Sequence, residues 1–330
     1  MTNIIFFGGG KLLASLIVQL LRKKYDDKLM VVTSKRQAIE IVEKKLSLKK
    51  FLKIKKINYV VANKLNHILM KKLKKNSIGI SVGAPWIFNQ KFISFFSNRL
   101  YNIHGSDLPK NRGGGGFSWQ ILMNEKNGCA TIHRLSSGID KGQIIFKNKF
   151  SFLGNNLPIN REKIYVENTT KFFMKKLKHF LSKRKIKGIN QNENMSTYWP
   201  RLNSKIHGWI DWKWKAKDIF KFINAFGSPY IGAHTKLNNK TVYIKICSLG
   251  PSTQKFHPFQ SGIIYRINRK HLSVSCLDGT LNITQVFNQN KKLMPVQNFK
   301  IGDRFNTPQK LIDLALSKRI RYSPKGIKLK

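Results

Sequence analysis

The chain has 330 residues, 41% of them apolar, and its 62 lysines and arginines against 15 aspartates and glutamates give a formal net charge of +47. This length is enough for two domains with ordinary hydrophobic cores. No uninterrupted apolar run approaches the roughly 20 residues of a membrane-spanning helix. The most apolar stretch, residues 12–21, follows a strand-like segment and not the basic start of a signal peptide. We therefore expect no membrane insertion and no signal peptide.

The first half of the sequence alternates between apolar, strand-like segments and amphipathic, helix-like segments. This rhythm is typical of a mostly parallel, Rossmann-like α/β sheet covered by helices on both faces. Ligands bind such sheets at the carboxyl ends of the strands, so the loops after Val82 and Ile103 are candidate parts of a site. The predicted strands are 3–8, 28–33, 58–62, 77–83 and 99–104, and the predicted helices are 11–24, 36–49, 63–75 and 88–97.

A second domain is predicted after a stretch without periodicity. Residues 129–150 have the pattern of two strands joined by a polar loop, and residues 160–184 that of a lysine-rich helix. A helix over 215–226 and several short, evenly spaced strands indicate a small β-barrel or sandwich. We therefore expect an α/β domain over 1–190, a linker over 191–207 and a small β-rich domain over 208–330.

The excess of positive charge has two interpretations. It would attract nucleic acid, nucleotides or another polyanionic substrate. A genome rich in A and T would also raise the lysine content and leave a solvated coat of lysines. The basic residues are spread over runs such as 44–56, 71–75 and 183–187 and form no single dense tail. The charge therefore indicates an affinity for anions without identifying one.

The cysteines and histidines predict neither a disulfide framework nor a metal centre. Cys129, Cys247 and Cys276 are scattered and form no CxxC pair, which favours a reducing, cytoplasmic compartment. No histidine outside the motifs below has metal-ligand spacing to acids or cysteines, so we expect no metal.

The glycine-rich turn GGGK at 8–11 has the position of a nucleotide-binding loop without its spacing. Leu13 stands where the third glycine of GxGxxG is needed, and no acidic residue for a ribose ends the second strand. The spacing of a phosphate-binding GxxxxGK[ST] loop is absent as well. We interpret this segment as a tight strand-to-helix turn.

A polar cluster follows the strand at 99–104. Asn102 and His104 lie two residues apart and therefore on one face of that strand, and Asp140 lies in a glycine-flanked loop that could fold over this face. An amide and an imidazolium can donate to an oxyanion, the imidazole can move the proton of an attacking amine, and the carboxylate can orient the imidazole or hold a water. The set favours attack of an amine on a carbonyl carbon. A polar loop that only caps the sheet edge is the alternative.

Three segments resemble the formyltransferase family that uses 10-formyltetrahydrofolate. They are NIHGSDLPKNRGGGGFSW (102–119), GCATIHRLSSGIDKGQII (128–145), and GWIDWKWKAKDIFKFINAFGSPYIGAHT (208–235), the last resembling the start of the family's OB-like C-terminal domain. The resemblance implies direct transfer of a formyl group from folate to an acceptor amine through a tetrahedral intermediate. It also implies that Asn102, His104 and Asp140, called the triad below, are catalytic.

By the same resemblance, the pteridine of the folate donor lies between the loop at 84–88 and the loop at 138–142. Arg112 matches the family's Arg-Gly pair, and anchoring of the glycine loop explains it equally well. His133 belongs to the family pattern outside the triad, where we expect a hydrogen-bonded core histidine. The residues implied in folate binding are Ile87, Phe88, Ser106, Asp107, Leu108, Pro109, Gly138 and Ile139, with ordinary core packing as the alternative for the first two.

The resemblance leaves two acceptors open, initiator methionyl-tRNA and a nucleotide-linked amino sugar. Members that act on tRNA carry a long basic loop after the second strand, and residues 31–45 contain no such insertion. The sequences SDLP and RGGGGFSW also depart from the SLLP and RGAAPI of those members, so we favour the amino sugar. A catalytically idle, RNA-binding member is a third hypothesis, against which the retained triad argues. The oligomeric state, homodimer or otherwise, is left open.

Overall fold

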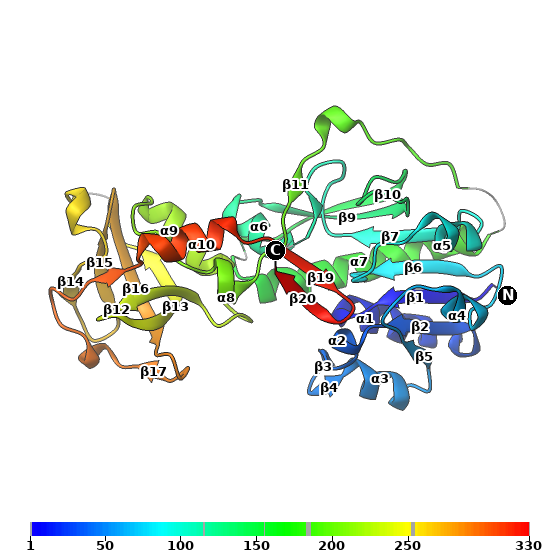
Figure 1. Cartoon of the computed structure of the whole chain (residues 1–330), viewed down its shortest axis with the longest axis horizontal. Coiled ribbons are helices and arrows are strands. Elements are labelled where there is room, and N and C mark those ends of the chain that lie inside the picture. The colour runs from blue at the N-terminus through cyan, green and yellow to red at the C-terminus, as the bar shows by residue number, and fades with distance from the viewer. Residues whose placement is uncertain (1, 115, 155, 183–185, 252–254, 330) are drawn as a thin grey trace.

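A computed structural model describes residues 2–114, 116–154, 156–182, 186–251 and 255–329. A seven-stranded sheet in the order β10-β9-β7-β6-β1-β2-β5 forms the centre of the N-terminal half (Figure 1). Five of its strands are parallel, and β9 and β10 form an antiparallel pair at one edge. The strands are β1 (Ile4–Gly8), β2 (Leu29–Thr33), β5 (Asn58–Val61), β6 (Ile78–Val82), β7 (Leu100–His104), β9 (Asn127–Arg134) and β10 (Ile144–Ser151).

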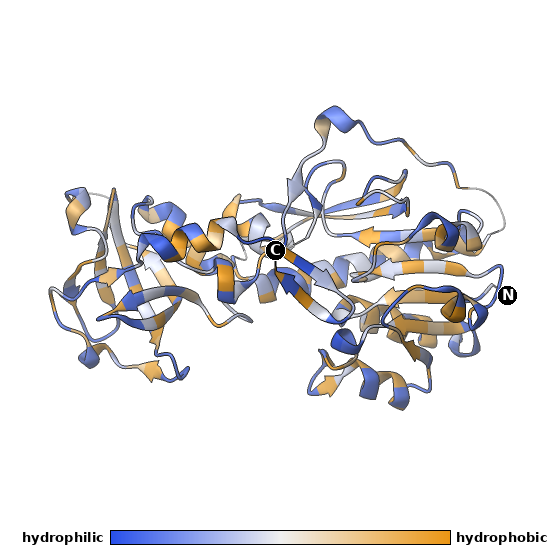
Figure 2. Ribbon diagram, viewed as in Figure 1, coloured by the Kyte–Doolittle hydropathy of each residue, from blue (hydrophilic) through white to orange (hydrophobic). Residues whose placement is uncertain are grey.

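Alternating side chains of β1 show why this sheet needs helices on both faces. Ile4 and Phe6 are buried in one core with α1 (Gly10–Arg22) and α7 (Pro158–Leu181), whereas Ile5 and Phe7 are buried in a second core with α4 (His67–Lys71) and α5 (Gln90–Phe95). The strands of the sheet are accordingly among the most hydrophobic segments in Figure 2. The mostly parallel sheet with a core on each face confirms the predicted fold class. Strands buried on both faces are apolar at most positions, which is why the sequence pattern indicated them.

The helix predicted over 36–49 is wrong. This segment forms a short helix α2 (Lys35–Ala38), a hairpin of β3 (Ile41–Glu43) and β4 (Leu46–Ser47), and a helix α3 (Leu48–Ile54). Ser34 and Ser47 each cap the start of a new helix through a side-chain oxygen, and Lys44 adopts a left-handed turn conformation. The helices predicted at 63–75 and 88–97 are also present, but they are shorter.

The C-terminal half contains an antiparallel half-barrel in the strand order β14-β15-β16-β13-β12-β18, with β17 beside β16. Helix α9 buries Ile219, Phe222 and Ile223 in the core of this sheet. The predicted β-rich second unit is thereby confirmed. Its elements are α8 (Ser204–His207), α9 (Ala216–Ala225), β12 (Ala233–Leu237), β13 (Lys240–Leu249), β14 (Ile264–Ile267), β15 (Leu272–Cys276), β16 (Gly279–Phe287), β17 (Leu293–Met294), β18 (Phe305–Asn306) and α10 (Gln309–Ser317).

Two segments outside these sheets return to the N-terminal half. The stretch predicted as a linker contains β11 (Tyr198–Trp199), which pairs in parallel with β8 (Arg112–Gly113), just ahead of α6 (Gly116–Leu122). After α10, a hairpin of β19 (Ile320–Ser323) and β20 (Gly326–Leu329) lies beside α1 and α2 (Figure 1). Both segments therefore reach the end of the sheet at which the parallel strands finish.

In the part of the chain that the structure describes, no helix is both long enough and apolar enough to cross a bilayer.

Candidate active site

The carboxyl ends of β1, β6 and β7 open into a cavity of about 690 Å³. This volume is typical of small-molecule sites. Segments far apart in the sequence contribute residues to the cavity wall, although some residues within these segments do not line it. These segments are 9–12, 81–88, 102–106, 111–114, 116–117, 135–140, 162–166, 198–201 and 320–322.

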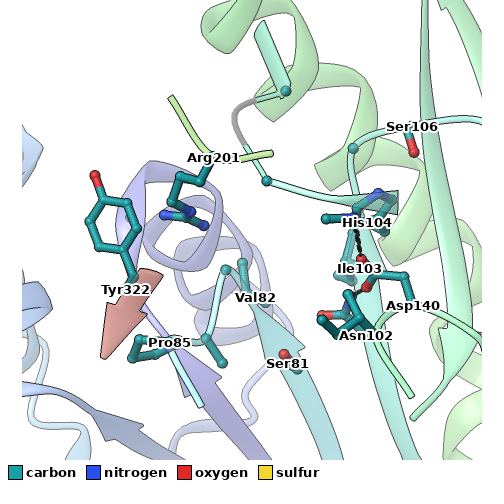
Figure 3. A pocket seen from close by; sticks show the side chains of 18 of the residues that line it. Ser81, Val82, Pro85, Asn102, Ile103, His104, Ser106, Asp140, Arg201 and Tyr322 are labelled. Carbon is teal, nitrogen blue, oxygen red and sulfur yellow. Dashed lines mark hydrogen bonds and ion pairs between the residues drawn. The ribbon is translucent and has the colours of Figure 1, made fainter. Parts of the chain in front are cut away.

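The structure brings the triad together on one wall of this cavity (Figure 3). Asn102 Nδ2 donates to Asp140 Oδ1 at 3.3 Å, and His104 Nδ1 lies 3.6 Å from Asp140 Oδ2. The backbone N–H of Gly113 donates to the same Oδ2 at 2.9 Å. About 12% of the His104 side chain and 13% of the Asp140 side chain are exposed, so these groups lie in an environment that screens charge poorly.

His133 is joined to the triad, which the sequence did not indicate. It is fully buried on β9, and the antiparallel register places it opposite Asn102 on β7. Its Nδ1 lies 2.8 Å from the carbonyl of Arg134, and its Nε2 lies 3.1 Å from Asn102 Nδ2 and 3.5 Å from Asp140 Oδ1. The core histidine predicted from the TIHRL segment therefore orients the Asn102 amide.

The two titratable groups of the triad shift in directions that suit base catalysis. Burial lowers the pKa of His104 below its ordinary value, although the Asp140 carboxylate opposes this shift. Burial would raise the pKa of Asp140, but His104, His133 and the Gly113 N–H outweigh it and hold that pKa well below the usual range. At neutral pH the site therefore combines an ionised Asp140 with a neutral His104.

The backbone at Asp140 is held in an uncommon conformation by a residue that the sequence analysis missed. Asp140 has a φ of 51°, in the left-handed region that costs energy for a residue with a side chain. Gln191 Nε2 donates to the backbone carbonyls of Asp140 at 2.7 Å and Gly142 at 2.8 Å. Gln191 lies in the stretch without periodicity, where no sequence signal marked it.

Arg112 holds the Gln191 side chain in turn. Arg112 is 5% exposed, and its guanidinium donates to Gln191 Oε1 from Nε at 3.2 Å and from Nη2 at 2.8 Å. It also forms two hydrogen bonds with the carboxylate of Glu193, at 2.9 and 2.7 Å. Arg112 therefore anchors the 191–193 segment against the glycine loop, in agreement with the anchoring explanation of this residue.

The residues predicted to bind folate fall into two groups. Ile87, Phe88, Ser106, Gly138 and Ile139 line the cavity. Ile87 and Ile139 are 74% and 49% exposed and stand on the two loops between which the pteridine is expected, so a flat, apolar ring could cover both. Phe88 is also part of the core, since its ring packs against Phe7.

Asp107, Leu108 and Pro109 do not line this cavity. The Asp107 carboxylate pairs with Lys147 at 2.6 Å and Lys149 at 2.7 Å, both on the edge strand β10. Leu108 is fully buried beneath the loop. These side chains shape the loop from outside, and Asp107 therefore has no contact by which it could select an acceptor.

The glycine-rich turn forms part of the cavity wall. Gly8 has a φ of 123°, and a Cβ there would lie 2.1 Å from the carbonyl oxygen of Val82, so only glycine permits the close approach of β1 to β6. Lys11, at the start of α1, pairs with Glu162 at 2.5 Å. The segment is the strand-to-helix turn that the sequence predicted, at the edge of the site.

Within the described ranges, no group of three or more His, Cys, Asp or Glu side chains is arranged to hold a metal ion.

Sequence comparison matches two models of one family in the order expected for its domains. "Formyl transferase" matches residues 2–157, and "Formyl transferase, C-terminal domain" matches residues 203–304. The methionyl-tRNA formyltransferase of Mycoplasma capricolum is 27% identical over 82% of this chain and 86% of its own length. The bifunctional polymyxin resistance protein ArnA of Wigglesworthia glossinidia brevipalpis is 30% identical over 44% of this chain, which spans only 22% of that protein.

Solved structures show the same fold. WlaRD, a sugar 3N-formyl transferase crystallised with dTDP and 5-N-formyl-THF, matches 88% of this chain and 99% of its own, with a TM-score of 0.65 and 25% identity. The N-formyltransferase of Helicobacter canadensis, in complex with folinic acid and dTDP-3-aminofucose, matches 87% of this chain and 100% of its own, with a TM-score of 0.66 and 21% identity. Domain matches, fold and motif residues agree, and the chain belongs to the formyltransferase family as a formyl-transferring enzyme.

Proposed function

We propose that this enzyme transfers the formyl group of 10-formyltetrahydrofolate to the amino group of a nucleotide-linked amino sugar. The observation that carries the choice of acceptor is the packing of the segment after β2. Ser34 caps α2 at once, and Val42, Leu48 and Phe51 of the following elements are buried in the main core. This segment is folded onto the domain and provides no long loop that could extend into a tRNA stem. The likeness to a sugar 3N-formyl transferase at 25% identity supports the same choice.

The acceptor amine attacks the formyl carbon of the donor. The tetrahedral intermediate collapses by breaking the bond between that carbon and N10 of the folate, which receives the proton removed from the amine and leaves as tetrahydrofolate. His104 Nε2 gives up its contact with the carbonyl of Asn111, 3.2 Å away, and takes the proton that the amine loses, while Nδ1 faces Asp140 Oδ2 at 3.6 Å. This pairing stabilises the charge as it develops. Asn102 Nδ2 exchanges its longer contact, the one to Asp140, for a hydrogen bond to the formyl oxygen.

The experiment offers the purified full-length chain 10-formyltetrahydrofolate with either charged initiator tRNA or a panel of nucleotide-linked amino sugars. Tetrahydrofolate release and the mass of the acceptor report transfer. We expect a mass increase of one formyl group on an amino sugar, and loss of transfer in Asn102→Ala. Transfer that survives both Asn102→Ala and Asp140→Ala would refute the assignment of the triad.

Methionyl-tRNA is the second candidate acceptor, because a relative named methionyl-tRNA formyltransferase matches 82% of the chain. The formal charge of +47 also suits a polyanionic substrate. Formylation of charged tRNA alone, with no amino sugar modified, would replace our proposal by this one.

A further inference from the structure

The wall of the cavity that faces the triad is built by the C-terminal hairpin and by the segment after β11. Ile320, Arg321 and Tyr322 of β19 and Arg201 line this wall. Figure 3 shows Arg201 and Tyr322 across the cavity from Asn102, His104 and Asp140, with Val82 between the two groups. The wall therefore brings together Arg201 and residues 320–322, which lie more than a hundred positions apart in the sequence.

Arg201 is a partly buried cation, and the Glu40 carboxylate that attracts it is already paired with Arg36. Its guanidinium carbon lies 4.1 Å from the centre of the Tyr322 ring, and that of Arg36 lies 4.9 Å from the same centre. Arg36 is neutralised by an ion pair with Glu40. Among the residues that the structure describes, Arg201 forms no ion pair with a carboxylate. Burial lowers the pKa of the Arg201 guanidinium, and repulsion by Arg36 adds to this, whereas the Tyr322 hydroxyl and the Glu40 carboxylate oppose the shift.

A partly buried charge of this kind is unfavourable unless an anion accompanies it. Lys11, another cation that lines the cavity, lies at the start of α1 and already forms an ion pair with Glu162. Arg321 is exposed on the rim, and it too forms no ion pair within the described part of the chain. The cavity therefore has an acid-base end at the triad and a cationic end at Arg201 and Arg321.

We propose that Arg201 and Arg321 form the subsite for the diphosphate of the acceptor, and that the C-terminal hairpin is thus part of the acceptor site. The inference rests on the proposed function, because that acceptor carries an amine at one end and phosphates at the other. A guanidinium is planar and presents paired N–H donors that match phosphate oxygens. The Tyr322 ring, between the guanidinium groups of Arg36 and Arg201, holds the hairpin in place.

The first test measures binding without turnover, so it stands even if the acceptor is misassigned. Calorimetric titration with inorganic pyrophosphate and with thymidine diphosphate compares the wild type with Arg201→Gln and Arg321→Gln. We expect Arg201→Gln to weaken both ligands about tenfold or more, as for the loss of a charged hydrogen bond, and Arg321→Gln to weaken them by a smaller factor. Arg269→Gln removes one exposed charge from the turn between β14 and β15, and its affinity should equal that of the wild type.

Arg321 also guards against a folding artefact, because its exposed side chain can be replaced without disturbing a core. Equal affinity of the wild type, Arg201→Gln and Arg321→Gln for both ligands would overturn the subsite. A second outcome would also overturn the subsite. In that outcome the wild type binds neither pyrophosphate nor thymidine diphosphate, and Arg201→Gln raises the KM for charged tRNA.

Kinetics then separate the acceptor from the donor. With a nucleotide-linked amino sugar that the enzyme formylates, Arg201→Gln should raise the acceptor KM about tenfold or more and leave the KM for 10-formyltetrahydrofolate unchanged. An increase confined to the folate KM would show that Arg201 binds the carboxylates of the donor, and would overturn the proposal. If no amino sugar is formylated, the proposed function fails, and the pyrophosphate titration still decides the subsite.

Discussion

Replacing Gln191 by alanine should impair catalysis although this side chain touches neither substrate. Its amide nitrogen donates the two hydrogen bonds to the carbonyls of Asp140 and Gly142, and its amide oxygen accepts hydrogen bonds from the Arg112 guanidinium. Each net hydrogen bond contributes about 1 kcal/mol, so the two that hold the loop contribute about 2 kcal/mol. The left-handed backbone at Asp140 costs about 1–3 kcal/mol. The clamp and the strain are therefore of similar size.

Without the clamp, Asp140 can relax away from its place beside His104 and Asn102. We expect kcat to fall about 10- to 100-fold, since misplacement of a catalytic group by about 1 Å has effects of that order. The KM for the folate donor should change little. Because the Asp140 carboxylate raises the pKa of His104 against burial, its displacement should also move the acidic limb of the pH–rate profile to lower pH.

The assay is steady-state formyl transfer across pH, with Gln90→Ala as the matched control. Gln90 lies on the far side of the second core and makes one exposed hydrogen bond, to Ser94, so this variant should match the wild type. A Gln191→Ala enzyme with wild-type kcat and an unmoved pH profile would refute the role of the clamp. A loss of thermal stability without a change in profile would assign Gln191 a structural role only.

Three other predictions concern the triad and its loop. Asp140→Asn should lower kcat about 10²- to 10⁴-fold, as expected for the loss of the charge that supports proton transfer, with tetrahydrofolate release as the measure and unchanged thermal melting as the control. The value of kcat/KM should fall as pH drops through the pKa of His104, which lies below the ordinary value, because protonated His104 cannot accept the amine proton. A profile that stays flat as the pH is lowered to the onset of acid unfolding would contradict this. Gly113→Ala should lower the free energy of unfolding, measured by urea denaturation, by about 1–3 kcal/mol. The reason is that Gly113 has a φ of 96° and a Cβ there would lie 2.4 Å from the Tyr198 ring. Gly116→Ala, whose Cβ meets nothing within 4 Å, should be close to neutral, and equal losses in both variants would contradict the steric argument.

The sheet and the placement of Asn102 and His104 could be predicted because both depend on local pattern. Runs such as residues 3–8 and 77–83 consist almost entirely of apolar and small residues, which marks strands buried on both faces. Two residues spaced by two on a strand share a face whatever the tertiary context. The prediction failed at 36–49, where Ile39, Ile41 and Val42 match a helical pattern as well as an edge hairpin, and short apolar runs do not separate the two.

The sequence by itself determined the fold class, the strand that carries Asn102 and His104, and through motif resemblance the family. Only the tertiary structure decided which other side chains support or face the triad. His133 reaches Asn102 through antiparallel pairing, Gln191 holds Asp140 from an aperiodic stretch, and Tyr322 meets Arg201 through a hairpin at the other end of the chain. Such contacts close long loops, and each is a pairing of two distant positions. No periodicity within either segment encodes a pairing of that kind, because it forms only when the packed cores bring the two segments together.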